Sequence, residues 1–243
     1  MSKRKDNEVK AFFNNTDVYL KNNSNIMLRK QIVRKLLNIP YSKNILDIGC
    51  GNGSLSLQFL GNENKITLLD ISSPMLDIAK NNISADRLDS VSLINVDFLE
   101  HEFKETYDIV ICVGVLAHVN SVDDTIKKIT EILNPGGKCI LQMTNYSSLI
   151  GKVLVGYYWF ISTLKQEDSY FVNAIKLKDI VAIAEKLNLM KINSLSYVSL
   201  LPGMSFINPE RRYEFQHFTM NNWLISKFGS EVFILFNKEG SLY

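Results

Sequence analysis

The sequence predicts an α/β fold in which helices cover both faces of a mostly parallel, doubly wound β-sheet. Short apolar runs alternate with amphipathic helical stretches up to about residue 145, and this alternation is typical of successive βαβ units. A glycine-rich turn, Gly49–Gly53, follows the first apolar run. Such a turn is expected where a strand ends and the backbone must approach a bound ligand.

The composition is that of a globular protein with one sizeable core. Of its 243 residues, 46% are hydrophobic and 21% are charged, and this length favours a single domain over two. The net charge of +2 is too small to indicate nucleic acid or an anionic membrane as a partner. No secretory signal is expected, because no apolar region follows the basic residues at the N-terminus. Cys50, Cys112 and Cys139 are too widely spaced for a zinc site or a disulfide framework, so a cytoplasmic location is predicted.

The first elements expected are helical. A helical pattern extends from Val9 to Leu37 and ends before Pro40, so residues 1–40 are expected to form a helical cap. Apolar runs then predict five strands, at Asn44–Ile48, Lys65–Leu69, Val91–Val96, Tyr107–Val113 and Lys138–Met143. Apolar residues at helical spacing predict helices between them, near Leu55–Leu60, Pro74–Ser84 and Val122–Leu133.

The regular alternation ends after Asn145. The segment Ser147–Leu164 is strongly apolar and aromatic, but glycines and a lysine interrupt it, so a membrane span is not predicted. A helix is expected at Lys178–Leu187, and an apolar run follows near Met190–Leu200. The last strand is expected at Glu231–Phe236.

The strongest chemical signal is an acid placed just before the glycine turn. Asp47 precedes Gly49 by two residues, and the glycines follow the spacing G-x-G-x-G at Gly49, Gly51 and Gly53. A nicotinamide or flavin site would show G-x-G-x-x-G, with a pyrophosphate bound at the turn. A carboxylate beside the turn would repel a pyrophosphate, and it suits a cofactor that carries an ammonium and a sulfonium group.

Two further acids end the next two predicted strands. Asp70 lies at the end of the second strand, where an acid can accept both ribose hydroxyls of a nucleoside cofactor. Asp97 lies at the end of the third strand and could accept a hydrogen bond from an adenine amino group. The aromatic ring of Phe98 could cover the face of that base.

With these motifs the chain resembles the class I S-adenosylmethionine-dependent methyltransferases, in particular the small-molecule group related to quinone-biosynthesis methyltransferases. The resemblance covers about Asn44 to Met143 and the last strand. Its further motifs are Asp70–Leu76, Tyr107–Val110, Leu116–Val119 and Leu133–Gly137. The resemblance implies a Rossmann-like, mostly parallel sheet of seven strands with an antiparallel last strand, N-terminal helices and a lid insertion.

The resemblance also implies one methyltransferase domain over residues 1–243. Its core at 44–145 would bind the cofactor, acceptor and lid insertions at 146–225 would surround strand six, and the last strand would span 231–237. The cofactor would be S-adenosylmethionine, the product S-adenosylhomocysteine, and no metal is expected. The cofactor-binding residues, carried over by position, are Asp47, Gly49, Cys50, Gly51, Gly53, Asp70, Ile71, Met75, Asp97, Phe98, Val113 and Gly114.

Within this set the resemblance assigns parts of the cofactor. Asp47 and the glycines would hold the methionine part, Asp47 through the amino group. Val113 and Gly114 would lie beside the sulfonium. His118 would lie on the acceptor side, either as a general base for an alcohol or as a helix-cap or packing residue.

The acceptor is the least determined part of the prediction. A small organic acceptor is expected, with O-methylation favoured over N- or C-methylation. No nucleic acid is expected, because the fourth strand lacks the N/D-P-P-Y/F motif and no dense basic surface is visible. The residues expected to line the acceptor pocket are Tyr19, Tyr146, Tyr158, Tyr170 and Arg211 or Arg212.

Two alternatives remain open at this stage. One is a membrane-surface methyltransferase of a quinone or glycolipid, with Leu149–Phe160 as a docking helix. The other is a non-catalytic protein that binds S-adenosylmethionine. Membrane contact is not favoured, and the protein is expected to be a monomer or a homodimer.

Overall fold

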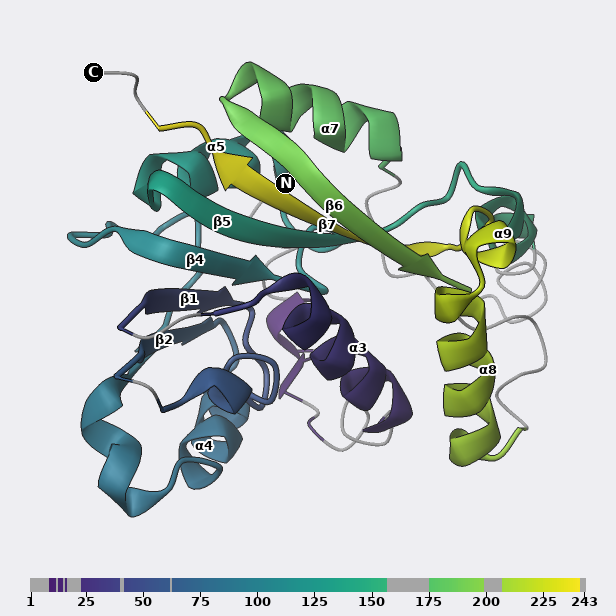
Figure 1. Cartoon of the computed structure of the whole chain (residues 1–243). Helices are drawn as coiled ribbons and strands as arrows, with labels where there is room; N and C mark the ends of the chain where they lie inside the picture. The colour runs from purple at the N-terminus through teal and green to yellow at the C-terminus, as the bar shows by residue number, and fades with distance from the viewer. Residues whose placement is uncertain are drawn as a thin grey trace.

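The computed structural model describes residues 9–11, 13–14, 16, 23–39, 42–61, 63–156, 175–198 and 207–240. Within these residues, seven strands form one sheet of order β3-β2-β1-β4-β5-β7-β6 (Figure 1). The strands are β1 (Asn44–Ile48), β2 (Lys65–Asp70), β3 (Val91–Asn95), β4 (Tyr107–Cys112), β5 (Leu133–Thr144), β6 (Leu189–Tyr197) and β7 (Glu231–Lys238). This arrangement confirms the predicted fold.

The strand directions place one crevice at the centre of the sheet. Strands β1 to β5 pair in parallel, whereas β7 is antiparallel to both β5 and β6. From β1 the chain winds outward to β2 and β3, and from β4 it winds outward in the other direction. In such sheets, ligands bind outside the carboxyl ends of the strands where the winding reverses. Here that point lies between β1 and β4.

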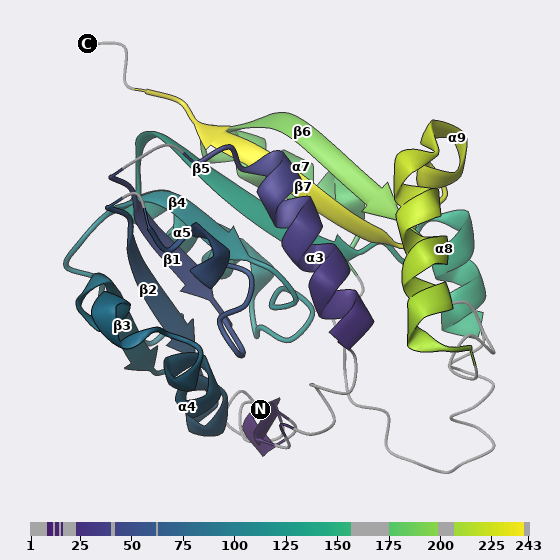
Figure 2. The same ribbon diagram turned by 60° about the horizontal axis from the view of Figure 1, so that its bottom comes forward.

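Helices cover both faces of the sheet (Figure 1). Buried side chains of α5 and α7 pack on one face, and those of α3 and α4 pack on the other. Figure 2 shows α8 on the same side as α3, and the Gln216 side chain on α8 donates to Asn25 Oδ1 on α3 at 3.3 Å. The helices are α3 (Asn23–Leu36), α4 (Ser73–Asn81), α5 (Val122–Ile132), α7 (Leu177–Lys186), α8 (Pro209–Asn221) and α9 (Trp223–Ser226).

Local sequence explains where the central helices begin. Ser72 precedes α4 and accepts a hydrogen bond from the Met75 N–H, and Pro74 occupies the first turn. Ser121 precedes α5 and accepts from the Asp124 N–H. These serines satisfy N–H groups that have no partner inside the helix, and acidic residues in the first turn of α5 favour the positive end of the helix dipole.

The structure differs from the sequence prediction in four elements. The helix expected near Leu55–Leu60 is only a short 3₁₀ turn, η1 (Leu57–Phe59), because just seven residues separate the two positive-φ glycines Gly53 and Gly61. Strand β5 begins earlier than expected, since Leu133 pairs with Tyr107 before a bulge restores regular pairing. Helices α8 and α9 were not predicted.

The described residues include only part of the predicted N-terminal cap and of the predicted insertion after Asn145. Residues 9–11, 13–14 and 16 are helical, and so are residues 149–156. Pro40 and residues 157–164 of the aromatic segment lie outside the described residues. Within the described ranges, no helix has both the length and the apolar character needed to span a bilayer.

Candidate cofactor and acceptor site

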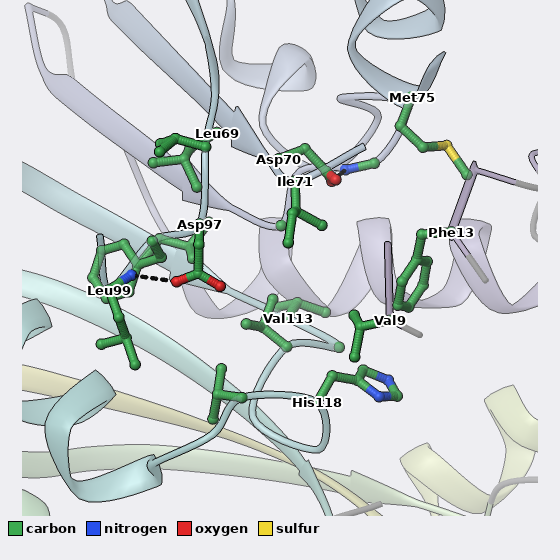
Figure 3. Close-up of a pocket in the computed structure, with 18 of the residues that line it drawn as sticks. Val9, Phe13, Leu69, Asp70, Ile71, Met75, Asp97, Leu99, Val113 and His118 are labelled. Atoms are coloured by element: carbon green, nitrogen blue, oxygen red, sulfur yellow. Dashed lines mark hydrogen bonds between the residues drawn. The ribbon is translucent and has the colours of Figure 1, made fainter. Parts of the chain in front are cut away.

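A cavity of about 900 Å³, counting the space at its open mouth, lies at the carboxyl ends of β1, β2 and β4 (Figure 3). Its walls come from the strand ends, from α3 and from the N-terminal residues. The described residues that line it are Val9, Phe13, Arg29, Ile48, Gly49, Gly51, Leu69, Asp70, Ile71, Met75, Val96, Asp97, Phe98, Leu99, Val113, Gly114, Val115, His118, Val119 and Asn120.

Most of the residues predicted from the sequence meet at this cavity. Those that line it are Gly49, Gly51, Asp70, Ile71, Met75, Asp97, Phe98, Val113, Gly114 and His118. Three residues that were predicted to bind the cofactor do not line the cavity, namely Asp47, Cys50 and Gly53. Tyr146, Arg211 and Arg212 are described but do not line the cavity either. Tyr19, Tyr158 and Tyr170 lie outside the described residues.

The glycine turn is held tightly against its neighbours. The N–H groups of Gly49 and Cys50 both donate to the Leu69 carbonyl, at 2.8 and 3.1 Å. Gly49 has a φ of +64°, and a Cβ atom there would collide with Cγ2 of Val115. Only glycine fits this position without strain, so the backbone of the turn forms part of the cavity wall.

Asp70 joins the glycine turn to the start of α4. Its Oδ2 accepts from the Gly51 N–H and its Oδ1 accepts from the Ser72 N–H, both at 2.8 Å. Burial raises the pKa of Asp70, and these two backbone hydrogen bonds oppose the rise. A carboxylate has about four acceptor positions, so the carboxylate can accept further hydrogen bonds from the cavity.

Asp97 lies on a loop that a lysine from α5 holds in place. Its Oδ1 accepts from the Leu99 N–H at 2.7 Å, and its carboxylate points into the cavity (Figure 3). Lys128 Nζ donates to the Leu99 carbonyl at 2.7 Å and lies 5.4 Å from the centre of the Phe98 ring. This loop therefore presents a carboxylate and apolar side chains to the same part of the cavity.

Asp47 lies beneath the glycine turn. It is 1% exposed, and its Oδ2 has no hydrogen-bond partner among the described residues. Burial raises the pKa of Asp47 to about 7, the Ser56 hydroxyl lowers it, and the nearby Asp70 charge raises it further. A contact between Asp47 and a cofactor amino group stays a prediction.

Arg29, on α3, lines the cavity and was missed by the sequence reasoning. Its Nη1 lies 3.1 Å from the position that a Cβ atom on Gly114 would take. The Arg29 charge opposes the rise that burial causes in the pKa of Glu231 on β7. The only sequence signal for this residue is an arginine beside the apolar face of a predicted helix, which is a weak signal.

The N-terminal residues cover the cavity beside His118. The rings of Phe13 and His118 meet edge to face, with 5.3 Å between their centres, and Figure 3 shows both beside Val9, across the cavity from Asp70. The Ser72 hydroxyl donates to Asn14 Oδ1 at 2.8 Å and so ties the N-terminal residues to α4. His118 thus lies on an apolar wall, apart from the two carboxylates.

No metal centre is found in the parts of the chain that the structure describes. They contain no group of three or more histidine, cysteine, aspartate or glutamate residues that could hold a metal ion. The polar groups that line the cavity include the carboxylates of Asp70 and Asp97, Arg29, His118 and the backbone of the glycine turn.

Comparison with known proteins adds a family and several relatives. A family model described as a methyltransferase domain matches residues 41–194, which is more than half of the chain. A ubiquinone biosynthesis O-methyltransferase of Coxiella burnetii is 26% identical over 159 residues, which cover 64% of this chain and 68% of the relative. A malonyl-acyl-carrier protein O-methyltransferase of Priestia megaterium is 31% identical over 144 residues, which cover 58% of this chain and 49% of the relative.

Solved structures share the same fold. Magnesium protoporphyrin IX methyltransferase from Synechocystis PCC 6803, whose crystal structure contains bound SAH, aligns with a TM-score of 0.68. The alignment covers 97% of this chain and 100% of that one at 17% sequence identity. At this identity the similarity shows the fold, and acceptor chemistry must be argued from the site itself.

Proposed function

The chain belongs to the family of S-adenosylmethionine-dependent methyltransferases, and from that premise we propose that it methylates a small organic acceptor, with oxygen favoured as the acceptor atom. One observation carries the proposal. The cavity has two carboxylates on one side, Asp70 and Asp97, and an apolar wall with His118 on the other. The first side suits a nucleoside, and the second suits an organic molecule with an ionisable hydroxyl.

The residues present fit the cofactor. The remaining acceptor capacity of Asp70 would take the ribose hydroxyls, and the second oxygen of Asp97 would accept from the adenine amino group. Ile71, Met75 and Leu99, which line the cavity, would provide apolar contacts for the base. Gly49 and Gly51 place the backbone of the glycine turn in the cavity wall, as expected where a cofactor approaches the backbone.

The methionine end of the cofactor would meet Arg29 and the loop after β4. Arg29 is the cation at the Gly114 side of the cavity, and a guanidinium is well suited to a carboxylate. Asp47, carried over from the family pattern, would favour the amino group from beneath the turn. These assignments are proposals that rest on charge and position.

Bound S-adenosylmethionine supplies a methyl group on a positively charged sulfur, so the electrophile needs no further activation. The protein's own task is to orient the acceptor and to exclude water. Val9, Phe13 and Val119 would exclude water at the acceptor side. His118 would accept the proton of an acceptor hydroxyl as the oxygen forms its new bond.

The names of the relatives support an oxygen acceptor. Two of them are described as O-methyltransferases, one in ubiquinone biosynthesis and one acting on a malonyl-acyl-carrier protein. The single sheet from β1 to β7 supports the proposal that residues 1–243 form one domain, with residues 44–145 binding the cofactor and 146–225 shaping the acceptor pocket.

A second candidate is methylation of a lipid-like acceptor at a membrane surface. It is supported by exposed apolar side chains on residues 149–156, among them Leu149 and Val153. Liposome flotation at low and high salt tests it. Recovery of all the protein in the unbound fraction in both conditions would contradict it.

The proposed function is tested in two steps. Titration calorimetry should show one S-adenosylhomocysteine bound per chain. Incubation with S-adenosylmethionine carrying a labelled methyl group, against pools of phenols, carboxylic acids and amines, should then transfer label to an oxygen acceptor. Binding without transfer to any pool would favour a non-catalytic binding protein, and label on an amine would replace the O-methylation proposal.

A further inference from the structure

A buried polar network lies behind the cavity, on strands that do not line it. Gln142 on β5 is 3% exposed and Glu231 on β7 is 7% exposed, and neither belongs to the cavity lining. A buried carboxylate is costly unless charged or hydrogen-bonded partners compensate it. The partners of Glu231 therefore indicate what this carboxylate does.

The hydrogen bonds fix the orientation of the Gln142 amide. Its Oε1 accepts from the Gly114 N–H at 2.7 Å, and its Nε2 donates to Glu231 Oε2. The other carboxylate oxygen of Glu231 accepts from the Thr144 hydroxyl at 3.0 Å. Because the backbone N–H of Gly114 can only donate, the amide oxygen of Gln142 must face Gly114, and the amide nitrogen then faces Glu231.

The same carboxylate interacts electrostatically with Arg29. The Arg29 charge lowers the pKa of Glu231 against the effect of burial, and the Arg29 guanidinium approaches Gly114 with Nη1 3.1 Å from the Cβ position there. Glu231 thus interacts electrostatically with Arg29 and, through the Gln142 amide, with the Gly114 peptide, and both of these groups line the cavity. One group is a cation on α3, and the other is a backbone segment after β4.

We propose that Glu231 and Gln142 are positioning residues for the amino-acid end of the cofactor. Glu231 orients the Arg29 guanidinium and the Gln142 amide, and Gln142 holds the Gly114 peptide in its positive-φ conformation. The cofactor's methionine carboxylate would then meet a guanidinium that is already oriented, which lowers the entropic cost of binding. This inference rests on the proposed assignment of S-adenosylmethionine to the cavity.

The test compares two ligands that share adenosine and differ at the amino-acid end. S-adenosylhomocysteine carries that end, whereas 5′-methylthioadenosine lacks it. Calorimetry on Glu231→Gln should show a loss of S-adenosylhomocysteine affinity of about tenfold or more, as expected when a charged hydrogen-bond partner is removed. The affinity for 5′-methylthioadenosine should stay within about twofold of the unchanged protein.

Gln142→Met is the second variant, and it carries the same expectation if Glu231→Gln does not fold. Thr219→Val is the matched control, because Thr219 is also buried and hydrogen-bonded, to the Val198 N–H and the Gln216 carbonyl, but on α8. It should change neither ligand's affinity. Equal losses for both ligands in Glu231→Gln and Gln142→Met, or no loss for either, would overturn the inference.

The proposed function fails in a different way. If the unchanged protein binds neither ligand, the assignment of the cofactor to the cavity is wrong, whatever the variants do. If the unchanged protein binds both ligands and the variants do not discriminate between them, only the positioning role is wrong.

Discussion

At the scale of single residues, His118 is the group on which the proposed proton transfer depends. Its ring lies on the apolar wall against Phe13. If it accepts the acceptor's proton, His118→Ala should lower turnover at saturating acceptor by about 100-fold or more. The affinity for S-adenosylhomocysteine should change little, because the carboxylates that would hold the nucleoside are intact. Steady-state kinetics and calorimetry on the same preparation measure both.

His217→Ala serves as the control for His118→Ala, because His217 lies on α8 and does not line the cavity. It should leave turnover unchanged. Unchanged turnover in His118→Ala itself would remove this histidine as a base and leave it the packing role that its contact with Phe13 already supports.

Asp47 predicts a pH dependence of stability whose sign follows from burial. Its pKa is about 7 in the folded chain and close to its ordinary value of 3.8 when unfolded. Between these values the folded state binds more protons than the unfolded state, so the free energy of unfolding falls as pH rises from about 4 through 7. Asp47→Asn should not show this fall.

Urea unfolding of both proteins at pH 5 and pH 8 tests the prediction. We expect the unchanged protein to lose about 2 kcal/mol relative to Asp47→Asn between these pH values, less than the full linkage value because the site can relax. The exposed acid Asp77 on α4 offers a control, since Asp77→Asn should preserve the fall. If the free energy of unfolding changed equally with pH in the unchanged protein and in Asp47→Asn, the raised pKa assigned to Asp47 would be contradicted.

At the scale of elements, Lys128 on α5 is expected to support the loop that carries Asp97. Its Nζ donates to the Leu99 carbonyl and lies over the rings of Phe98 and Phe103. Lys128→Met removes that hydrogen bond and both cation–π contacts while keeping an apolar side chain of similar length. We expect about a three- to tenfold loss of affinity for S-adenosylhomocysteine.

The loss in Lys128→Met should extend equally to 5′-methylthioadenosine, because in the proposed site the loop would face the adenine and not the amino-acid end. This pattern differs from the one expected for Glu231→Gln, so the two variants test opposite ends of the cavity. Lys127→Met, at the exposed neighbouring position, should bind both ligands normally. A loss restricted to S-adenosylhomocysteine in Lys128→Met would show that the loop does not hold the adenine.

The elements also show what the sequence could and could not predict. The central strands are continuous apolar runs buried on both faces, and they were identified because such runs occur in few other contexts. Helix α8 was missed because its buried residues include the polar Gln216 and Thr219, so no apolar stripe marks its inner face. Arg29 was missed for the same reason, since hydrophobic periodicity does not reveal a polar side chain that faces inward.

At the scale of the whole molecule, distant parts of the chain meet at one cavity. The N-terminal residues and α3 contribute Phe13 and Arg29, and the ends of strands β1 to β4 with the loops after them contribute the carboxylates and glycines. On β7, Glu231 interacts electrostatically with Arg29. The first five strands and the glycine turn were predictable from motifs in the first 145 residues. The link from β7 was not, because it depends on side chains that are 202 residues apart, Arg29 and Glu231.

This convergence predicts that the cofactor stabilises the molecule as one unit. A ligand that binds only the folded state at 100 times its dissociation constant adds about 2.7 kcal/mol to the free energy of unfolding. For a domain of this size that amounts to a rise in Tm of about 5 to 10 °C. Differential scanning calorimetry with S-adenosylhomocysteine should show one transition that moves upward as a whole.

Asp70→Asn is the control for this measurement, because it removes one of the two acceptor oxygens proposed for the ribose. It also removes the acceptor of one backbone N–H, at Gly51 or at Ser72, so the effect of the ligand is measured against the ligand-free variant. At the same concentration of S-adenosylhomocysteine, the Tm of Asp70→Asn should rise by less than the Tm of the unchanged protein. Two separate unfolding transitions, of which the ligand raises the Tm of only one, would contradict the prediction that the molecule unfolds as one unit. In that case the sheet edge formed by β6 and β7 would be energetically independent of the cavity, and the positioning role of Glu231 would lose its physical basis.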